Sequence, residues 1–172
     1  MTRAEVLAFA AEDIGAGAIA NHRFFDVGGF NLVSSVVPEG VWTPSTVWVF
    51  PPSAGVAMSV VSSSVNDVAG GTGCREVRVE YLTPLGVAAG VTVATNGVGV
   101  VSLGVSPKWV IRAYGTQFGA TGACAGIIQV RDAVPTVYDS IGASFTESTS
   151  AKYMCPAGKR AYVYDWHAAT NS

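Results

Sequence analysis

Charged side chains are scarce in this sequence. Asp, Glu, Lys and Arg together make up 13% of the 172 residues, and the formal net charge at pH 7 is -2. A nucleic-acid-binding protein needs a basic face that contacts phosphates. The composition therefore argues against a nucleic-acid partner.

Metal ligands are also few. The chain has two histidines and three cysteines, and no pair of cysteines forms a C-x-x-C motif. The aspartates are scattered and show no D-x-D-x-D-G spacing, which a calcium loop would need. Zinc and calcium sites are both improbable on these patterns. We therefore expect no metal and no cofactor.

Long apolar runs are missing as well. No run approaches the roughly 20 residues that a membrane-spanning helix requires. The N-terminal segment TRAEVLAFAAEDIGAG is too acidic and too polar for a signal peptide. The sequence predicts a soluble protein without a membrane partner.

The residues of a catalytic site do not assemble in the sequence. A nucleophile would have to use His22 or His167 as its base, and no G-x-S-x-G motif is present. A catalytic base also needs a third group to orient it, so two ordinary polar histidines are the simpler interpretation. The glycines at 70, 71 and 73 precede a strand pattern, whereas a phosphate-binding loop precedes a helix. We predict a non-enzymatic protein.

The chain is organised around the stretch from Val60 to Leu82. VVSSS is short and β-prone, NDVAGGTG collects residues that favour tight turns, and CREVRVEYL alternates with a period of two. We expect Val77, Val79 and Tyr81 on one strand face and Cys74 with Glu76 on the other. Such alternation is typical of an antiparallel sheet with one buried face.

Further strands are predicted on both sides of this stretch. They are VAMSVVSSS at 56–64, LGVAAGVTVAT at 85–95, VGVVSLG at 98–104, KWVIRAY at 108–114 and IIQVRD at 127–132. Asn96-Gly97 is the strongest hairpin signal, joining the strands at 85–95 and 98–104. In KWVIRAY, we expect Trp109, Ile111 and Ala113 to face one way. Seven or more short strands separated by turns predict an all-β fold, an antiparallel β-sandwich resembling a jelly roll.

The first 55 residues differ from the rest. Dense prolines fragment them around a short strand at 47–50, and residues 2–20 form either the one predicted helix or part of an extended arm. We expect an N-terminal arm at 1–55 and a sandwich domain at 56–172. From residue 145 the chain either pairs back onto the main sheet or begins an incomplete second β unit. An apolar arm needs a surface to cover. Its predicted anchors are Phe24, Phe25, Phe30, Trp42 and Trp48.

The three cysteines, Cys74, Cys124 and Cys155, cannot all pair within one chain. The simpler interpretation is that they are buried or inert thiols, because free cysteine packs as a small hydrophobic residue. The alternative is that at least one of them forms a disulfide between subunits.

The segment SVVSSSVNDVAGGTGCREVRVEYL resembles an element of virion structural proteins of tailed bacteriophages. Four further segments resemble the same group in order: NHRFFDVGGFN, PEGVWTPSTVWVFPPSAG, KWVIRAYGTQFGATGACAGIIQVR and SAKYMCPAGKRAYVYDWHA. The resemblance covers about residues 21–168 and rests on order and spacing. Two departures are that the chain ends at the PAGK hairpin and that cysteines replace small or β-branched residues.

This resemblance implies a structural role on the phage particle surface after assembly in the host cytoplasm. The expected function is capsid decoration or cementing, with the major capsid protein or neighbouring virion proteins as partners and a symmetric homo-oligomer as the working form. The alternatives are a neck, collar or fibre component, or a module that binds a receptor or glycan. Sugar binding would favour exposed rings such as Trp42 or Trp166.

Overall fold

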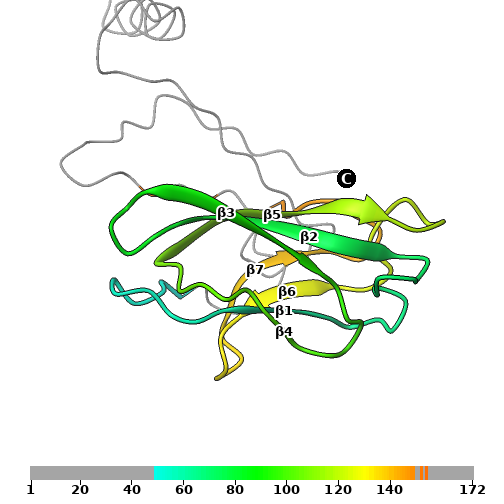
Figure 1. The fold of residues 1–172 in the computed structure, drawn as a ribbon, viewed down its shortest axis with the longest axis horizontal. Coiled ribbons are helices and arrows are strands. Elements are labelled where there is room, and N and C mark those ends of the chain that lie inside the picture. Colours follow the sequence, from blue (N-terminus) through cyan, green and yellow to red (C-terminus); the bar gives the residue numbers. More distant parts are fainter. Residues whose placement is uncertain (1–48, 150–151, 153, 155–172) are drawn as a thin grey trace, which may run out of the picture.

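The computed structural model describes residues 49–149, 152 and 154, and the described part of the chain contains strands and no helix (Figure 1). This confirms the all-β prediction. The seven strands are β1 (Ser59–Ser62), β2 (Cys74–Leu82), β3 (Ala88–Ala94), β4 (Val101–Ser102), β5 (Trp109–Phe118), β6 (Ile128–Arg131) and β7 (Val137–Ile141).

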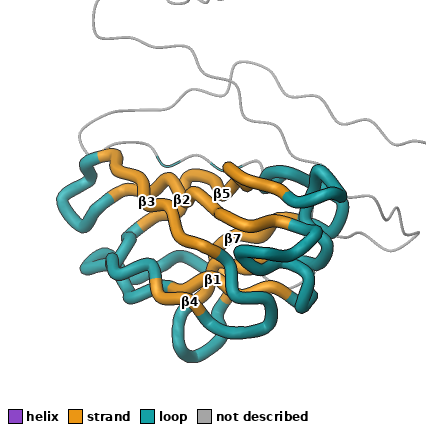
Figure 2. The backbone as a smooth tube through the Cα atoms, turned by 45° about the vertical axis from the view of Figure 1, so that its right-hand side comes forward, coloured by secondary structure: helices purple, strands orange, loops and turns teal. Residues whose placement is uncertain are grey.

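The strands form two sheets whose neighbouring strands all pair antiparallel. One sheet has the order β4-β1-β6-β7 and the other the order β3-β2-β5. Figure 2 shows the two sheets stacked as layers. The prediction of an antiparallel, sandwich-like fold is therefore confirmed.

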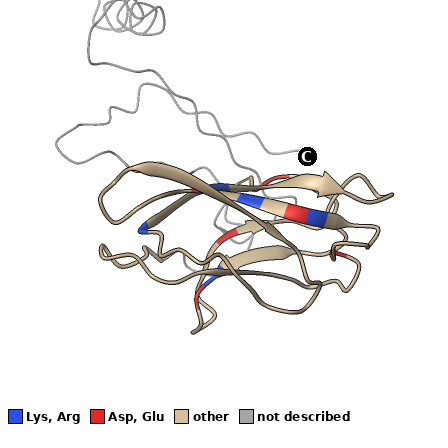
Figure 3. Cartoon of the chain, in the orientation of Figure 1, with Lys and Arg blue, Asp and Glu red and all other residues tan. Residues whose placement is uncertain are grey.

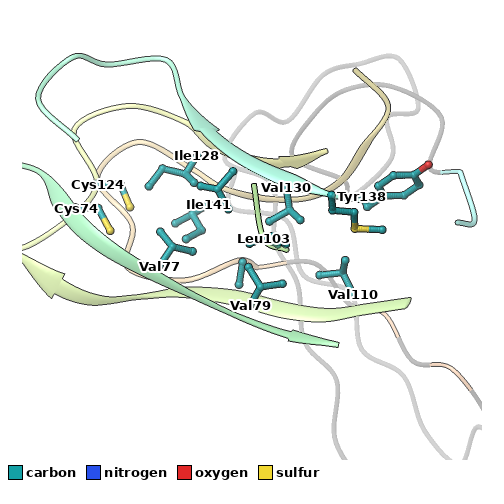
Figure 4. Close-up of a cluster of buried hydrophobic side chains, with 13 residues drawn as sticks. Cys74, Val77, Val79, Leu103, Val110, Cys124, Ile128, Val130, Tyr138 and Ile141 are labelled. Atoms are coloured by element: carbon teal, nitrogen blue, oxygen red, sulfur yellow. The ribbon is translucent and has the colours of Figure 1, made fainter. Parts of the chain in front are cut away.

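The core lies between the two sheets. Val77 and Val79 of β2 are fully buried, and they face Ile128 and Val130 of β6 across the layers (Figure 4). The alternation predicted for Val77, Val79 and Tyr81 is confirmed, since all three are buried while their neighbours are half-buried. Removing one such side chain from water stabilises the fold by about 1.5–3 kcal/mol. Burial of these apolar faces is what holds the layers together.

The prediction that Cys74 shares a face with Glu76 is wrong. Cys74 pairs with Phe118 and Glu76 with Gln117, so Arg75 is an extra residue on β2 and forms a bulge. A bulge of one residue shifts the side chains beyond it to the other face. Cys74 consequently points into the core and is fully buried.

A second irregularity corrects the expectation for KWVIRAY. Glu80 pairs with Arg112 and Tyr81 with Val110, which leaves Ile111 as an extra residue on β5. Val110 and Ala113 are buried, whereas Ile111 is half-buried and lines the outer face of the sheet. The strict alternation of Trp109, Ile111 and Ala113 is therefore wrong.

The Asn96-Gly97 turn forms, but it does not make the predicted hairpin. Gly97 has a positive φ of 57°, and the Gly99 N–H donates to the Asn96 carbonyl at 2.9 Å. The strands on either side nevertheless pair in different sheets, β3 with β2 and β4 with β1. The turn carries the chain from one layer to the other.

Two other differences concern strand positions. β7 follows Pro135 and was not among the predicted strands, while Val49 and Phe50 of the predicted short strand are not in a strand. The predicted helix at 2–20, the rest of the arm to residue 48 and the C-terminal segment at 155–172 lie outside the described residues. The boundary between the arm and the sandwich stays a prediction.

Candidate binding surface

The predicted anchors of the arm, Phe24, Phe25, Phe30, Trp42 and Trp48, all lie outside the described residues. Within residues 49–149, 152 and 154, no cluster of three or more His, Cys, Asp or Glu side chains could hold a metal ion. Candidate surfaces must therefore be sought on the sandwich itself. It offers a charged sheet face and an apolar set of loops.

Charged residues are concentrated along β2 in the β3-β2-β5 sheet (Figure 3), and several of them contact one another. Arg112 Nε lies 2.9 Å from Glu80 Oε2, and the Tyr114 hydroxyl donates to Glu80 Oε1 at 3.2 Å. Arg78 Nε lies 3.7 Å from the same carboxylate. The group forms because Glu80 and Arg112 are direct cross-strand partners, a position at which opposite charges attract.

These contacts stabilise the charged forms of Glu80 and Arg112. The hydrogen bond from Arg112, opposed by partial burial, lowers the pKa of Glu80, and the same bond raises the pKa of Arg112. The Arg112 guanidinium also lies 4.8 Å from the centre of the Tyr114 ring. Glu80 is therefore ionised at neutral pH and held by its neighbours, so it is a poor candidate for proton transfer.

A shallow hollow of about 320 Å³ lies beside this charged group. Its floor and walls come from β2, β3 and β5, because the small residues of β3 leave room above the sheet. The hollow combines charged groups with an apolar side chain. It is lined by Arg78, Glu80, Ala88, Ala89, Gly90 and Ile111.

Asp67 organises the loops at one end of the sandwich. Its side chain is fully buried, and Oδ1 accepts hydrogen bonds from Cys74 N at 2.7 Å and Ala125 N at 2.8 Å. Oδ2 accepts from the Ser62 hydroxyl at 2.6 Å and from Gly126 N at 2.9 Å. A buried carboxylate is tolerated when donors satisfy it in this way. Asp67 thus joins the β1–β2 loop, the start of β2 and the loop before β6.

The sequence interpretation missed this role. It placed Asp67 in a turn and grouped it with the scattered carboxylates. The available signal was the stretch SSSVNDVAGGTG, in which a serine five residues earlier donates to the carboxylate. Gly73 adds a steric reason, since any Cβ at that position would collide with the Asp67 carboxylate.

Apolar side chains are exposed on the loops that Asp67 connects. We call this set the apolar rim, and its members are between 42% and 67% exposed. The loops are tied together by bonds from Ser63 N to Ile127 O and from Gly97 N to Asp67 O. The apolar rim consists of Val65, Val98, Val100 and Ile127. These residues are exposed on loops that backbone hydrogen bonds join.

Cys74 and Cys124 lie next to each other in the core, with their side chains pointing together (Figure 4). Both are buried free thiols. The hydrogen bond with Cys74, together with burial, holds the pKa of Cys124 far above its usual value. A disulfide from either residue to another subunit would require the fold to open. Cys155 lies outside the described residues, so its part in the disulfide hypothesis stays a prediction.

Comparisons with protein-family models, curated proteins and solved structures give no match to this chain. Within the described residues, the structure has no helix with the length and apolar character needed to span a membrane. The fold and the surfaces described above are therefore the observations on which a function can be argued.

Proposed function

We propose that this chain is a non-enzymatic structural protein of a tailed-phage virion. Its role is to decorate and cement the head by binding the lattice of the major capsid protein, as a homo-oligomer on the particle surface. The proposal is supported by the sequence resemblance and by a sandwich-like fold with exposed apolar loops. The predicted arm anchors would add contact area.

The apolar rim is the observation that carries the proposal. A single exposed valine is ordinary on a protein surface, but four exposed apolar residues on loops that hydrogen bonds join favour a contact surface. The Asp67 bonds order these loops before any partner arrives. Binding then avoids much of the entropic cost of ordering a loop, which commonly weakens association.

A sedimentation assay tests the proposal. Purified full-length chain is mixed with heads of the encoding phage that lack this protein, and the bound fraction is measured after pelleting. We expect saturable binding, and we expect Val65→Ser with Val98→Ser to weaken it at least tenfold, about 1.4 kcal/mol. Failure of the wild-type chain to pellet with heads over a wide concentration range would refute the decoration role.

A matched control uses the opposite end of the sandwich. Val134 is 80% exposed in the β6–β7 loop, and the β1–β6 register places that loop away from the apolar rim. Val134→Ser should leave binding to heads unchanged. An equal loss in this variant would indicate a non-specific effect of surface hydrophobicity.

The charged hollow favours a second candidate function, binding of a glycan or receptor by a neck or fibre component. Arginine and glutamate beside an apolar wall can donate to and accept from sugar hydroxyls while contacting the sugar ring. A glycan array with wild-type chain and an Arg78→Ala variant tests this function. Binding lost in the variant supports it, and an array without signal excludes it for the sugars tested.

A further inference from the structure

Asp139 and Lys152 form a buried pair at the open edge of the sandwich. Lys152 Nζ lies 2.9 Å from Asp139 Oδ1, and the exposed fractions of the two side chains are 6% and 0%. Asp139 lies in the middle of β7, between the buried residues Tyr138 and Ser140. This pair has no role in the binding surfaces described above.

The segment between Asp139 and Lys152 connects the two sheets. After β7 the chain crosses to β5, where Gly115 N donates to the Thr146 carbonyl at 2.8 Å and Ser148 N donates to the Ala113 carbonyl at 2.8 Å. Lys152 then reaches back to β7, and its Nζ also donates to the Tyr138 carbonyl at 3.1 Å. The segment that contacts one sheet is thereby held against an edge strand of the other.

We infer that the Asp139 carboxyl group and the Lys152 amine condense to an intramolecular amide, an isopeptide bond between β7 and the segment that follows β7 and contacts β5. The atoms meet a basic requirement for such a reaction. Nζ lies 2.9 Å from an oxygen of the carboxyl group whose carbon it would attack, so the fold holds the two reacting groups next to each other. This modification goes beyond the proposed function and does not depend on it.

The reaction balances without an oxidant or a co-reactant. The lone pair of the neutral amine attacks Cγ of the protonated carboxyl group, and a C–N bond forms. The C–O bond to the hydroxyl breaks, and the hydroxyl leaves with one proton from nitrogen as a water molecule. One carboxylic acid and one amine thus give one amide and one water, with no change in oxidation state.

The environment favours the neutral forms that react. Burial raises the pKa of Asp139 and lowers the pKa of Lys152, although the attraction between the two charges opposes both shifts. Taking two charges out of water is costly, and that cost can exceed what their attraction returns. An amide removes both charges and keeps the contact between the two segments.

Mass spectrometry of the intact wild-type chain tests the inference. We expect a mass lower than that of the unmodified chain by one water molecule. Tryptic digestion should leave the bond after Lys152 uncut, because trypsin does not recognise an acylated lysine. The digest should contain a peptide spanning 132–159 that has lost one water. An intact chain at full mass, cut normally after Lys152, would overturn the inference.

Two variants remove the remaining ambiguity. Lys152→Arg keeps a positive charge for Asp139 but removes the amine, so the water loss should disappear. Lys108→Arg changes a lysine of the β4–β5 connection and should retain the loss. Cyclisation of Asp139 onto its own backbone would also release water, yet it would persist in Lys152→Arg. Water loss in that variant would therefore also refute the cross-link.

Discussion

Replacing Asp67 by alanine should remove a large part of the stability of the sandwich. The substitution leaves three backbone N–H groups, those of Cys74, Ala125 and Gly126, without the acceptor that they have in the wild-type fold. A buried donor without a partner costs about 1–3 kcal/mol, so three together cost roughly 3–9 kcal/mol before relaxation. The whole free energy of unfolding of a domain is only about 5–15 kcal/mol. Asp67→Ala should therefore unfold at much lower urea concentration, or fail to fold at 25 °C.

The assay is urea unfolding followed by the far-UV circular dichroism of the strands. Asp67→Asn preserves the shape and one acceptor oxygen, but its NH₂ group would face the Ser62 hydroxyl or a backbone N–H. We therefore expect its free energy of unfolding to lie between those of wild type and Asp67→Ala. The control is Asp132→Ala, because Asp132 accepts bonds from Val134 N, Thr136 N and the Tyr138 hydroxyl in a more exposed loop. If Asp67→Ala lowers the free energy of unfolding no more than Asp132→Ala does, the reasoning about Asp67 is refuted.

Three further predictions use the same unfolding assay or a thiol assay. Gly73→Ala should destabilise the fold by about 1–3 kcal/mol, because the added Cβ would collide with the Asp67 carboxylate. At Gly70 an added Cβ meets open space, so Gly70→Ala should change the stability little. Burial tends to raise the pKa of Asp132, but hydrogen bonds from its own loop outweigh it and lower that pKa. Asp132 thus contributes fully to stability above its unfolded pKa of about 3.9. The difference in free energy of unfolding between wild type and Asp132→Asn should therefore shrink as the pH falls toward the lower pKa of Asp132 in the folded state. Cys74 and Cys124 should not react with an aromatic disulfide reagent in a native variant whose third cysteine is serine, and both should react in urea. Fast reaction of the native protein would contradict their burial.

The strand pattern of the sequence was sufficient for the class of fold and for the buried face of β2. Period-two alternation depends only on the backbone geometry of a strand, so Val77 and Val79 could be assigned to the core from sequence alone. The bulges at Arg75 and Ile111 could not be assigned in this way. A bulge is decided by the pairing of two strands that are distant in sequence, and it reverses the facing of every residue beyond it. Cys74 was misplaced for that reason.

The Asn96-Gly97 turn shows a related limit. Its conformation is local and was predictable, because the dipeptide accepts positive φ with little strain. Which strands pair after the turn is a tertiary property, determined here by the pairing of β4 with β1 and of β3 with β2. A turn motif therefore predicts a change of direction more safely than it predicts a hairpin.

The two buried aspartates show why the binding surface was harder to predict than the fold. In the sequence, Asp67 and Asp139 look like ordinary members of a scattered set, yet the fold surrounds the first with four donors and pairs the second with a lysine. Both arrangements join segments that are far apart along the chain or belong to different sheets. Part of the apolar rim depends on the first arrangement, because the Asp67 carboxylate accepts hydrogen bonds from Ala125 N and Gly126 N, next to Ile127. A substitution at Asp67 that still permits folding should therefore weaken binding to heads, since the loops would have to be ordered again on contact.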